Sequence, residues 1–455
     1  MGSCPIFVRQ AHAFEFQLVF VPPLGGEMEV ILSKKTIKMG IFGGYRGSTF
    51  YKSVLANNAE IVAVCDFNEK YANKAREMLG ADVAVYTAFD DFIEHEGLEA
   101  VLLSNYFHEH APYAIRLLER GIHVLSECTS NATMAQGVAL VRAAEKSSAI
   151  YMLSENYPFM KFNQEMRRIY RGGTLGKVLF AEGEYNHPLD PADNKYAIEL
   201  CPTSKHWRYS LPRAYYITHS LAPLMYITGA SPKRVTAMPV YDPIRIDFNG
   251  ISRGVPERAA IITTLNDDDS VFRVTGCASF GAHENSYRIC AEKGQVENLR
   301  DGTGRVLLNY NKWDVPEDVS SATSCYVPML RDKDAALAAA AGHGGGDFFV
   351  IREFLNCIRE NKRPEFDVYF GTTMASVAIL GHRSMLENGV PYDIPDFRKE
   401  EDRVKYENDT LSPFYGTDGT EPTIAATNRP DYWLSAEGRA EYDRKAKAFL
   451  EKADQ

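Results

Sequence analysis

The feature that most constrains the fold of this sequence is the alternation of apolar and helical stretches between residues 36 and 156. The segments "TIKMGIF", "AEIVAVCD" and "LEAVLLSN" are short and apolar, as buried strands are. "EKYANKAREMLG", after the second of these, and "HAPYAIRLLERG", after the third, have the spacing of amphipathic helices. Strands that alternate with helices form a parallel sheet with right-handed crossovers. We therefore predict an α/β fold that begins with a doubly wound parallel sheet.

The turn after the first predicted strand, "GGYRGS" at residues 43–48, has the position of a phosphate-binding turn. A strict G-x-G-x-x-G motif would need glycine at 43, 45 and 48, whereas this chain has glycine at 43, 44 and 47. The turn nevertheless follows a strand and opens a helix, and Asp66 ends the second strand about 20 residues further on. Helix N-terminal amides would hold a pyrophosphate, and Asp66 would accept hydrogen bonds from a ribose. These features predict a Rossmann-type dinucleotide-binding domain.

The carboxylate of Asp66 would repel a 2′-phosphate, which favours NAD over NADP as the cofactor. Arg46 in the turn opposes this preference, because a guanidinium also binds phosphate. The alternative is a plain strand-to-helix turn in a sheet that binds no nucleotide. The predicted cofactor-binding residues of this region are Gly43, Gly44, Tyr45, Arg46, Gly47 and Asp66.

The composition of the chain argues against several classes of function. A formal net charge of -10 argues against nucleic acid as the main partner, because phosphate neutralisation needs a basic face. No apolar run reaches the length of a membrane span. The 8 cysteines are scattered without a Cys-x-x-Cys pair, which predicts no metal site and suits a cytoplasmic protein with reduced thiols. The 455 residues allow two domains, after an N-terminal extension at residues 1–34 that lacks a clear secretory signal.

A longer segment at residues 110–147, "HAPYAIRLLERGIHVLSECTSNATMAQGVALVRAAEKS", resembles the Gfo/Idh/MocA oxidoreductases. Their corresponding stretch reads H-A-x-x-A-x-x-A-L-x-A-G-K-H-V-x-x-E-K-P, and the similarity continues through "GTLGKVLFAEGEYNH" and "HGGGDFFVIREFLNCI" to "GVPYDIPDF". The resemblance covers residues 36 to 398 and implies two domains, a dinucleotide-binding domain at 35–156 and a substrate-binding and oligomerisation α/β domain with a large open, mostly antiparallel sheet at 157–400. The charged sequence near the C-terminus predicts a tail with a final helix at 401–455. The cofactor contacts that it implies are Asn105, Tyr106, His110, Glu127, Cys128 and Asn156.

Two motifs depart from those of the ordinary dehydrogenases in this family. Where they have E-K-P, this chain has Glu127, Cys128 and Thr129, and a thiol has neither the charge nor the reach of lysine. Where they have D-x-x-x-H, this chain keeps His219 but has Tyr215 in place of the aspartate. Two groups that such dehydrogenases use are therefore missing together.

A branch of the same family also lacks the lysine, namely the NAD-dependent glycoside hydrolases typified by the α-N-acetylgalactosaminidases. Their Y-P-T-H-G-L-G-P stretch is similar to "YITHSLAP" at residues 216–223. Their W-R and E-G-x-Y-x-H motifs are similar to "WR" at 207–208 and "EGEYNH" at 182–187. The resemblance implies a redox-neutral cycle of oxidation at sugar carbon 3, elimination at carbon 1, hydration and re-reduction by the bound NAD. The net reaction would be hydrolysis of a glycoside.

Such a cycle needs groups that move protons, and these motifs supply candidates. Histidine exchanges protons near neutral pH, and Tyr216 lies three residues before His219, close enough to share one helix face. Tyr185 and His187 lie two residues apart, so on a strand they would point the same way. We predict proton-transfer roles for His219 and Tyr216, with Tyr185 and His187 in the same pocket. The alternatives are tyrosines that pack in the core and histidines, His110 included, that are structural.

The segment "SKHWRYSLPR" at residues 204–213 supplies candidates for substrate binding. Trp207 would offer a stacking face for a sugar ring, and Arg208 with its basic neighbours would bind a carboxylate or sulfonate of an acidic sugar. A solvated basic loop is the alternative. His343, in the glycine-rich "HGGGDFF", is a further candidate because this region of the family approaches the active site.

Two other functions remain open at the level of sequence. One is an NAD-dependent sugar or glycoside dehydrogenase, such as a glycoside 3-oxidase, that uses His219 in place of the lysine. The other is a non-catalytic NAD-binding protein. The expected partners are a small-molecule sugar or glycoside and further copies of the chain, in a dimer or tetramer, since open-faced sheets invite pairing. Neither nucleic acid nor a membrane is an expected partner.

Overall fold

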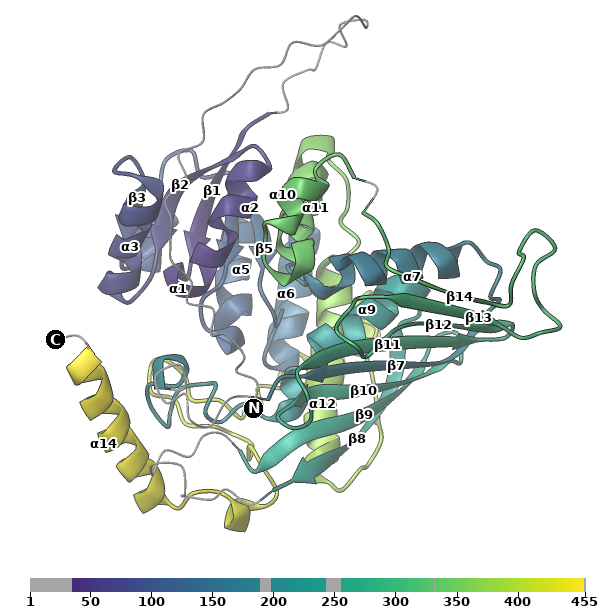
Figure 1. Cartoon of the computed structure of the whole chain (residues 1–455). Helices are drawn as coiled ribbons and strands as arrows, with labels where there is room; N and C mark the ends of the chain where they lie inside the picture. Colours follow the sequence, from purple (N-terminus) through teal and green to yellow (C-terminus); the bar gives the residue numbers. More distant parts are fainter. Residues whose placement is uncertain (1–34, 189–197, 243–254, 331, 454–455) are drawn as a thin grey trace, which may run out of the picture. The chain divides into compact units, whose positions relative to one another are not determined.

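A computed structural model gives the fold of the chain and describes residues 35–188, 198–242, 255–330 and 332–453 (Figure 1). The predicted N-terminal extension at residues 1–34 lies outside the described residues. None of the helices within these ranges is long and apolar enough to cross a membrane.

A six-stranded sheet has the strand order β3-β2-β1-β4-β5-β6, and each pair of neighbours is parallel. The chain runs outward from β1 to β3, returns to β4 beside β1, and runs outward again to β6. This is the doubly wound order of a Rossmann fold, so the predicted fold class is confirmed. The strands are β1 (Ile37–Phe42), β2 (Ala59–Cys65), β3 (Ala84–Tyr86), β4 (Ala100–Leu103), β5 (His123–Ser126) and β6 (Tyr151–Leu153).

The helices that alternate with these strands begin where the sequence offers capping groups. The side chain of Asn68 accepts a hydrogen bond from the Lys70 amide at the start of α3. Thr133 and Gln136 form a capping box at the start of α6, which satisfies two otherwise unpaired amides. The helices of this region are α1 (Gly44–Gly47), α2 (Tyr51–Ala56), α3 (Glu69–Leu79), α4 (Phe89–Phe92), α5 (His110–Glu119) and α6 (Met134–Lys146).

A second sheet of nine strands has the order β14-β13-β12-β11-β7-β10-β9-β8-β15. Strands β7 and β10 run parallel, and the other neighbouring pairs are antiparallel, which confirms the predicted large, mostly antiparallel sheet. Its strands are β7 (Val178–Asn186), β8 (Pro232–Tyr241), β9 (Glu257–Asn266), β10 (Val271–Ala278), β11 (Glu284–Ala291), β12 (Gly294–Asn298), β13 (Val306–Tyr310), β14 (Thr323–Tyr326) and β15 (Tyr392–Asp393).

Strand β7 and helix α9 (Thr218–Thr228) lie in close contact at Gly183. A Cβ atom at position 183 would come within 2.1 Å of the Ser220 carbonyl oxygen, so any side chain there would push the helix off the strand. Along β7 the buried positions alternate, and Tyr185 points to the same face as Gly183. Gly183 therefore lets the helix that carries His219 rest directly on the strand that carries Tyr185.

The two sheets share one buried apolar core. Helix α12 contacts α6 and β6 at the first sheet and β8 at the second, so it links them. The predicted domain boundaries after residues 156 and 400 remain predictions, because this core runs across the first of them. The remaining helices are α7 (Lys161–Arg171), α10 (Ala335–Ala339), α11 (Gly346–Glu360), α12 (Val368–Leu386), α13 (Glu400–Tyr406) and α14 (Ala436–Ala453).

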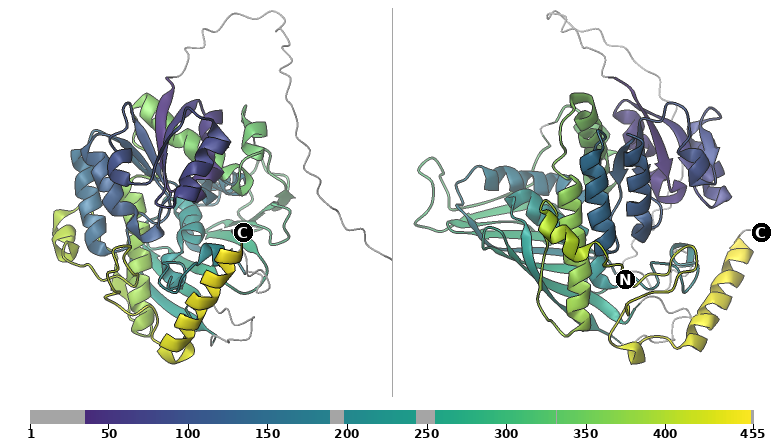
Figure 2. Two further views of the ribbon diagram at one scale, coloured as in Figure 1. Left: turned by 90° about the vertical axis from the view of Figure 1, so that its left-hand side faces the viewer. Right: turned by 180° about the vertical axis from the view of Figure 1, so that it is seen from behind.

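Helix α14, at the place of the predicted final helix, holds the segment 198–211 from the outside (Figure 2). The carboxylate of Asp443 accepts hydrogen bonds from the amide and the hydroxyl of Ser204, at 2.6 and 2.8 Å. The hydroxyl of Tyr442 donates to the carbonyl of Cys201 at 2.5 Å. The C-terminal helix thus fixes the segment that carries two of the predicted substrate-binding residues.

Candidate active site

A cavity of about 2100 Å³ lies at the carboxyl ends of the parallel strands and reaches the second sheet. It is larger than the roughly 300–1,000 Å³ of pockets for drug-sized ligands, so it has room for a dinucleotide and a sugar together. Gly47 and Asn156 are the two predicted site residues that do not line it. The predicted residues that line it are Gly43, Gly44, Tyr45, Arg46, Asp66, Asn105, Tyr106, His110, Glu127, Cys128, Tyr185, His187, Trp207, Arg208, Tyr216, His219 and His343.

The glycine-rich turn forms the nucleotide end of the cavity, although its glycines are displaced from the usual spacing. Gly43 has a φ of 103°, and a Cβ atom there would lie 2.3 Å from the carbonyl of Ser104. At Gly47 a Cβ atom would lie 2.4 Å from the Ile41 side chain, so this glycine lets α1 pack on β1. The glycine at 47 thus does the helix–strand packing that the third glycine of the usual motif does.

Asp66 sits at the end of β2, where a ribose-binding carboxylate is expected. One carboxylate oxygen accepts hydrogen bonds from the amides of Gly44 and Tyr45 at 2.8 and 3.4 Å, and the other accepts one from Asn68 at 2.8 Å. Burial raises the pKa of Asp66, and these three amides oppose the rise. The carboxylate is therefore held at the cavity wall by the turn itself.

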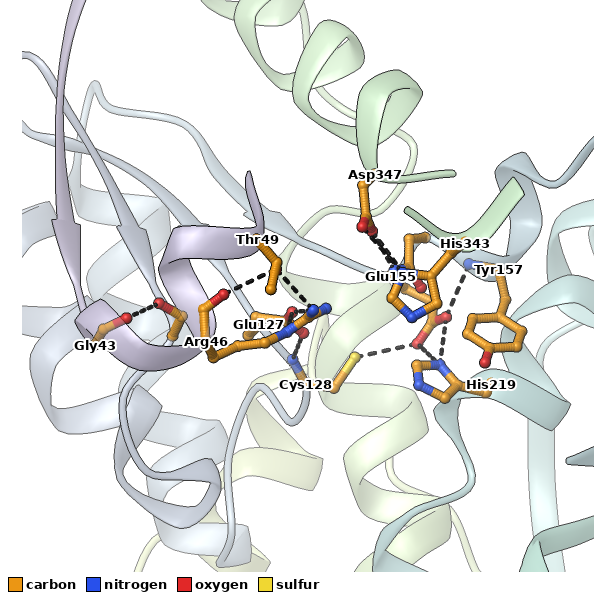
Figure 3. Close-up of polar contacts among 12 residues, drawn as sticks. Gly43, Arg46, Thr49, Glu127, Cys128, Glu155, Tyr157, His219, His343 and Asp347 are labelled. Carbon is orange, nitrogen blue, oxygen red and sulfur yellow. Dashed lines mark hydrogen bonds and ion pairs between the residues drawn. The ribbon is translucent and has the colours of Figure 1, made fainter. Parts of the chain in front are cut away.

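Arg46 binds Glu127 (Figure 3). Its guanidinium lies 2.6 Å from the Glu127 carboxylate, bonds Thr49 at 2.9 Å and stacks 4.6 Å from the Phe50 ring centre. This arginine is thus neutralised within the chain. Its engagement removes the sequence argument that it would favour a cofactor with a 2′-phosphate.

The polar groups at the centre of the cavity fit a nicotinamide dinucleotide. Both side-chain amide atoms of Asn105 are buried and have no hydrogen-bond partner among the described residues, and this side chain lines the cavity. His110 differs, because its two ring nitrogens contact the carbonyls of Thr129 and Asn105 at 3.0 and 3.3 Å. Burial lowers the pKa of His110, which keeps it neutral. These contacts favour the structural alternative for His110.

Tyr216, His219 and Glu155 form a hydrogen-bonded row at the other end of the cavity, and Figure 3 shows the contact between His219 and Glu155. Nδ1 of His219 lies 2.8 Å from a carboxylate oxygen of Glu155, and Nε2 lies 3.4 Å from the Tyr216 hydroxyl. Burial alone would raise the pKa of Glu155, but the charge and hydrogen bond of His219 bring it below its ordinary value. An ionised Glu155 accepts the Nδ1 proton, which leaves Nε2 as the nitrogen that faces Tyr216 and the cavity.

Aromatic rings hold His219 in this orientation. Tyr157, in the 3-10 helix η3 (Tyr157–Phe159), stacks on the imidazole with a centroid distance of 3.9 Å and an interplanar angle of 16°. Tyr185 meets the same ring edge-on at 4.9 Å. Its neighbour His187 lies against His283, with ring centroids 4.7 Å apart, and within the described part of the chain Nδ1 of His187 has no hydrogen-bond partner. Tyr185 and His187 thus enter the same pocket as His219, as predicted from their spacing.

His343 approaches from the 3-10 helix η5 (His343–Gly345), which precedes α11. Its Nδ1 lies 3.0 Å from Asp347, and the amide of Asn156 donates to the same carboxylate at 2.6 Å. Burial lowers the pKa of His343, but the hydrogen bond and charge of Asp347 outweigh it and raise the pKa. Asn156 therefore supports the His343–Asp347 pair and does not reach the cavity wall, unlike the prediction that it contacts the cofactor.

Trp207 lies differently from the sequence prediction. Its indole stacks on Phe107, with centroids 5.0 Å apart and an interplanar angle of 13°, and the Arg208 guanidinium sits 4.3 Å above the indole ring. The residue is 6% exposed. Because this packing covers the indole, Trp207 does not offer the free stacking face that was predicted for a sugar ring. Trp207 supports Arg208 instead.

Two family models match this chain. Residues 37–155 match the oxidoreductase family with an NAD-binding Rossmann fold, Gfo/Idh/MocA, and residues 298–403 match the C-terminal domain of glycosyl hydrolase 109. The chain combines these two domains. The resemblance inferred from the sequence is thereby confirmed, and so is an NAD-binding Rossmann domain.

Curated relatives and solved structures are similar to this chain over most of its length. A glycosyl hydrolase family 109 protein of Shewanella pealeana is 23% identical over 422 residues, which cover 81% of this chain and 87% of the relative. One of Saccharopolyspora erythraea is 25% identical over 395 residues, covering 80% and 84%. The structure of a levoglucosan dehydrogenase with NADH and levoglucosan matches with a TM-score of 0.65 and 15% identity, over 80% of this chain and 100% of the other. The structural likeness establishes the fold.

The two motif departures of this chain have a common structural outcome at Glu155. Cys128, in the place of the family lysine, donates from its thiol to Glu155 at 3.1 Å, and burial raises the pKa of this thiol well above its ordinary value. Tyr215, in the place of the aspartate, turns away and donates to the carbonyl of Ala132. Glu155 therefore supplies the carboxylate for His219 from a different strand end.

Sequence reasoning missed Glu155, Tyr157 and Asp347 as site residues. A signal for Glu155 was present, since it closely follows β6 at the carboxyl edge of the sheet. No signal in the sequence pairs it with His219, which lies 64 positions away.

Proposed function

We propose that this protein is an NAD-dependent glycoside hydrolase whose reaction causes no net oxidation or reduction. The observation that carries the proposal is the row Tyr216–His219–Glu155, which replaces the missing lysine and aspartate with another set of proton-transfer groups. The glycosyl hydrolase 109 match at residues 298–403 and the relatives of that name support it.

The cofactor end of the cavity fits NAD through the turn at Gly43–Gly47, the carboxylate of Asp66 and the unpartnered amide of Asn105. When bound, NAD supplies a hydride acceptor that is regenerated within the catalytic cycle. The chain itself must then bind and orient the sugar, and move its protons.

Tyr216 and His219 are the groups proposed to take the proton from the sugar hydroxyl at carbon 3. Burial raises the pKa of Tyr216 strongly, with the charge of Arg208 acting in the opposite direction, so the phenol is protonated before substrate binds. Its hydroxyl can pass a proton to Nε2 of His219 while it receives one from the sugar. Glu155 stabilises the imidazolium that this transfer creates.

Tyr185 and His187 are the groups proposed to act on the hydrogen at carbon 2. Burial lowers the pKa of His187, helped by the neighbouring His283, so the imidazole is neutral at pH 7 and can accept a proton. Its ring meets that of Tyr185 edge-on at 5.7 Å, and both residues line the cavity. His219 on α9 and Tyr185 on β7 therefore lie on two elements that Gly183 holds in contact, with Tyr216 just before α9 and His187 just after β7.

The first test uses the NAD-loaded protein and a panel of nitrophenyl glycosides of both anomers, neutral and acidic. Nitrophenol release and absorbance at the NADH band are followed in the same sample. The proposal predicts many turnovers of release without net NADH, and exchange of the carbon 2 hydrogen when the reaction runs in D2O. NADH growth without release would replace the proposal with the second candidate, a sugar dehydrogenase, which the same proton-transfer groups would serve.

Adjacent tyrosines offer a matched pair of variants for this assay. Tyr216→Phe removes the hydroxyl that faces His219, and we expect kcat to fall roughly 100-fold. Tyr215→Phe removes a hydroxyl that binds the carbonyl of Ala132 outside the cavity, and we expect kcat to stay within about threefold of wild type. Equal losses in both variants would show that Tyr216 acts only through packing.

The chain is also proposed to form a homo-oligomer through the second sheet. The face of β7 opposite the site carries Glu182 and Glu184, which pair with Arg273 and Arg288 from the neighbouring strands and with Arg300 just after β12. These arginine side chains are 37–56% exposed, so one side of the sheet is open. Light scattering after gel filtration would give the mass, and a monomer at micromolar concentration would refute this part of the proposal.

A further inference from the structure

The charged side chains at the nucleotide end and the middle of the cavity are mostly neutralised within the chain. Arg46 pairs with Glu127 at 2.6 Å, and Arg258 pairs with Asp242 at 3.2 Å. His343 pairs with Asp347 at 3.0 Å. Each of these cations therefore has its own carboxylate, and none of them needs an anion from a ligand.

Arg208 and Arg213 differ, because neither has a carboxylate within ion-pair distance among the described residues. Arg208 stacks on the Trp207 indole, and Arg213 donates from Nε to the carbonyl of Glu257 at 3.0 Å. Both side chains are partly buried and line the cavity. Guanidinium groups are charged at every physiological pH, so this part of the cavity wall carries two uncompensated positive charges.

The position of these charges is the sugar end of the cavity. Arg213 lies in the 3-10 helix η4 (Arg213–Tyr215), immediately before Tyr216, and its guanidinium contacts β9. A Cβ atom at Gly276 of β10 would lie 2.5 Å from the Arg213 carbonyl, so η4 rests on the second sheet. The pyrophosphate turn at β1 belongs to the other sheet. The two arginines therefore face the substrate and not the phosphates of the cofactor.

The groups around the two arginines show the effect of their charge. Burial raises the pKa of the Cys277 thiol, while Arg213 and Arg208 both act to lower it. Burial lowers the pKa of His206 to about 3, with the charge of Arg208 acting in the same direction. His206 is therefore neutral at pH 7, and the positive potential at this wall comes from the arginines.

We propose that the substrate sugar carries an anionic group, a carboxylate, sulfonate or phosphate ester, that binds between Arg208 and Arg213. Arginine suits such anions, because its planar fork donates two parallel hydrogen bonds to a pair of oxygens. The stacking of Arg208 on Trp207 holds the fork in place, and α14 holds their segment through Ser204 and Asp443. This inference rests on the proposed function and names the substrate class of the same site.

The test compares matched nitrophenyl glycosides that differ at carbon 6: glucoside with glucuronide, galactoside with galacturonide, and the 6-sulfate and 6-phosphate esters. We expect kcat/KM for one anionic member to exceed that of its neutral counterpart by roughly 10- to 100-fold. The preferred anion shows whether the site binds a carboxylate, a sulfate or a phosphate. Equal or better turnover of the neutral sugars would overturn the inference and leave the glycosidase proposal intact.

The variants Arg208→Gln and Arg213→Gln test the two binding groups. Each should lower the anionic-to-neutral ratio of kcat/KM roughly tenfold or more, a change that a purely structural loss would not produce. Lys205→Gln is the matched control, because Lys205 belongs to the same segment, pairs with Glu421 at 3.1 Å and does not line the cavity. An equal shift of the ratio in the control would attribute the effect to the general charge of the segment and overturn the proposal.

The experiments distinguish failure of the proposed function from failure of this inference. If the protein forms NADH without releasing nitrophenol, the hydrolase proposal falls, and the anionic-to-neutral ratio of NADH formation still tests the arginine pair. Thermal stabilisation of the NAD-loaded protein by glucuronate and galacturonate, against glucose and galactose, gives a readout without turnover. Stabilisation by the acids that Arg208→Gln abolishes would support the inference, and no stabilisation by any acid would count against it.

Discussion

The two ends of the cavity recognise their ligands in different ways. At the nucleotide end, backbone amides and the close approach of glycines form the site, and Arg46 is already paired with Glu127. At the proposed sugar end, side chains from segments far apart in sequence meet, and Arg208 and Arg213 have no carboxylate at ion-pair distance among the described residues. A site formed by backbone groups tolerates displaced motif residues, whereas a site formed by side chains depends on the identity of each of its residues.

The largest expected effect comes from Glu155→Gln, which should damage the sugar end and spare the nucleotide end. The amide of glutamine carries no charge, so it would not stabilise the imidazolium of His219. We expect kcat to fall roughly 100-fold with the affinity for NAD within about twofold of wild type. Steady-state kinetics and NAD titration by protein fluorescence measure the two quantities. A parallel loss of NAD affinity would show that the two ends are not independent.

Gly43→Ala tests the opposite end and should act on folding and NAD binding. A Cβ atom would meet the Ser104 carbonyl at 2.3 Å, and we expect a loss of about 2 kcal/mol or more in the free energy of unfolding. Gly80→Ala is a matched control, since Gly80 has a φ of 104° but a Cβ atom there would have no neighbour within 4 Å. Chemical denaturation of both variants separates backbone strain from the steric clash. Equal destabilisation would assign the whole effect to strain.

Asp66→Asn should have a smaller and more selective effect at the nucleotide end. The amide keeps the shape of the carboxylate but loses the charge that the turn amides stabilise. We expect NAD to bind roughly tenfold more weakly, with a smaller change for NADP. Calorimetric titration with both cofactors measures the ratio. An unchanged NAD-to-NADP ratio would contradict the role given to Asp66.

His343→Gln is expected to have the smallest effect, seen as a change in how stability depends on pH. The pKa of His343 is raised in the fold, so its contribution is fully present below about pH 6.5 and is lost as the pH rises through the folded pKa. The pKa of Asp347 is lowered, so its contribution is present above about pH 4 and is lost as the pH falls through its folded pKa. Melting temperatures should differ most between wild type and variant near pH 5–6 and least near pH 9. A difference that does not vary with pH would contradict the ion pair.

The regular part of the fold was predictable from the sequence because it depends on periodic patterns. The strands and helices from Ile37 to Leu153 follow local hydrophobic spacing, and the role of Asp66 follows from its place after β2. The family resemblance located His219 and Tyr216, which the structure brings to 3.4 Å. These features depend on residues that are close in sequence or that occupy motif positions.

The remaining features depend on contacts between distant segments. Glu155 reaches His219 because β6 and α9 meet at one sheet edge, and nothing in the local sequence of either indicates the other. Trp207 has an indole suited to stacking on a sugar, but Phe107 and Arg208 cover it. Asn156 occupies a motif position predicted to contact the cofactor, but its side-chain amide donates a hydrogen bond to Asp347 at the start of α11. Tertiary packing decides each of these outcomes.

The contacts between α14 and the segment 198–211 have a consequence for biosynthesis. A nascent chain that has emerged as far as α13 contains every strand of both sheets, as well as the dinucleotide turn. It still lacks Tyr442 and Asp443, which form hydrogen bonds with Cys201 and Ser204 in the segment that carries Arg208. The last part of the catalytic centre to be completed is therefore made by residues that touch no substrate. Premature termination or a C-terminal cut would leave a folded protein that binds its cofactor but selects its sugar poorly.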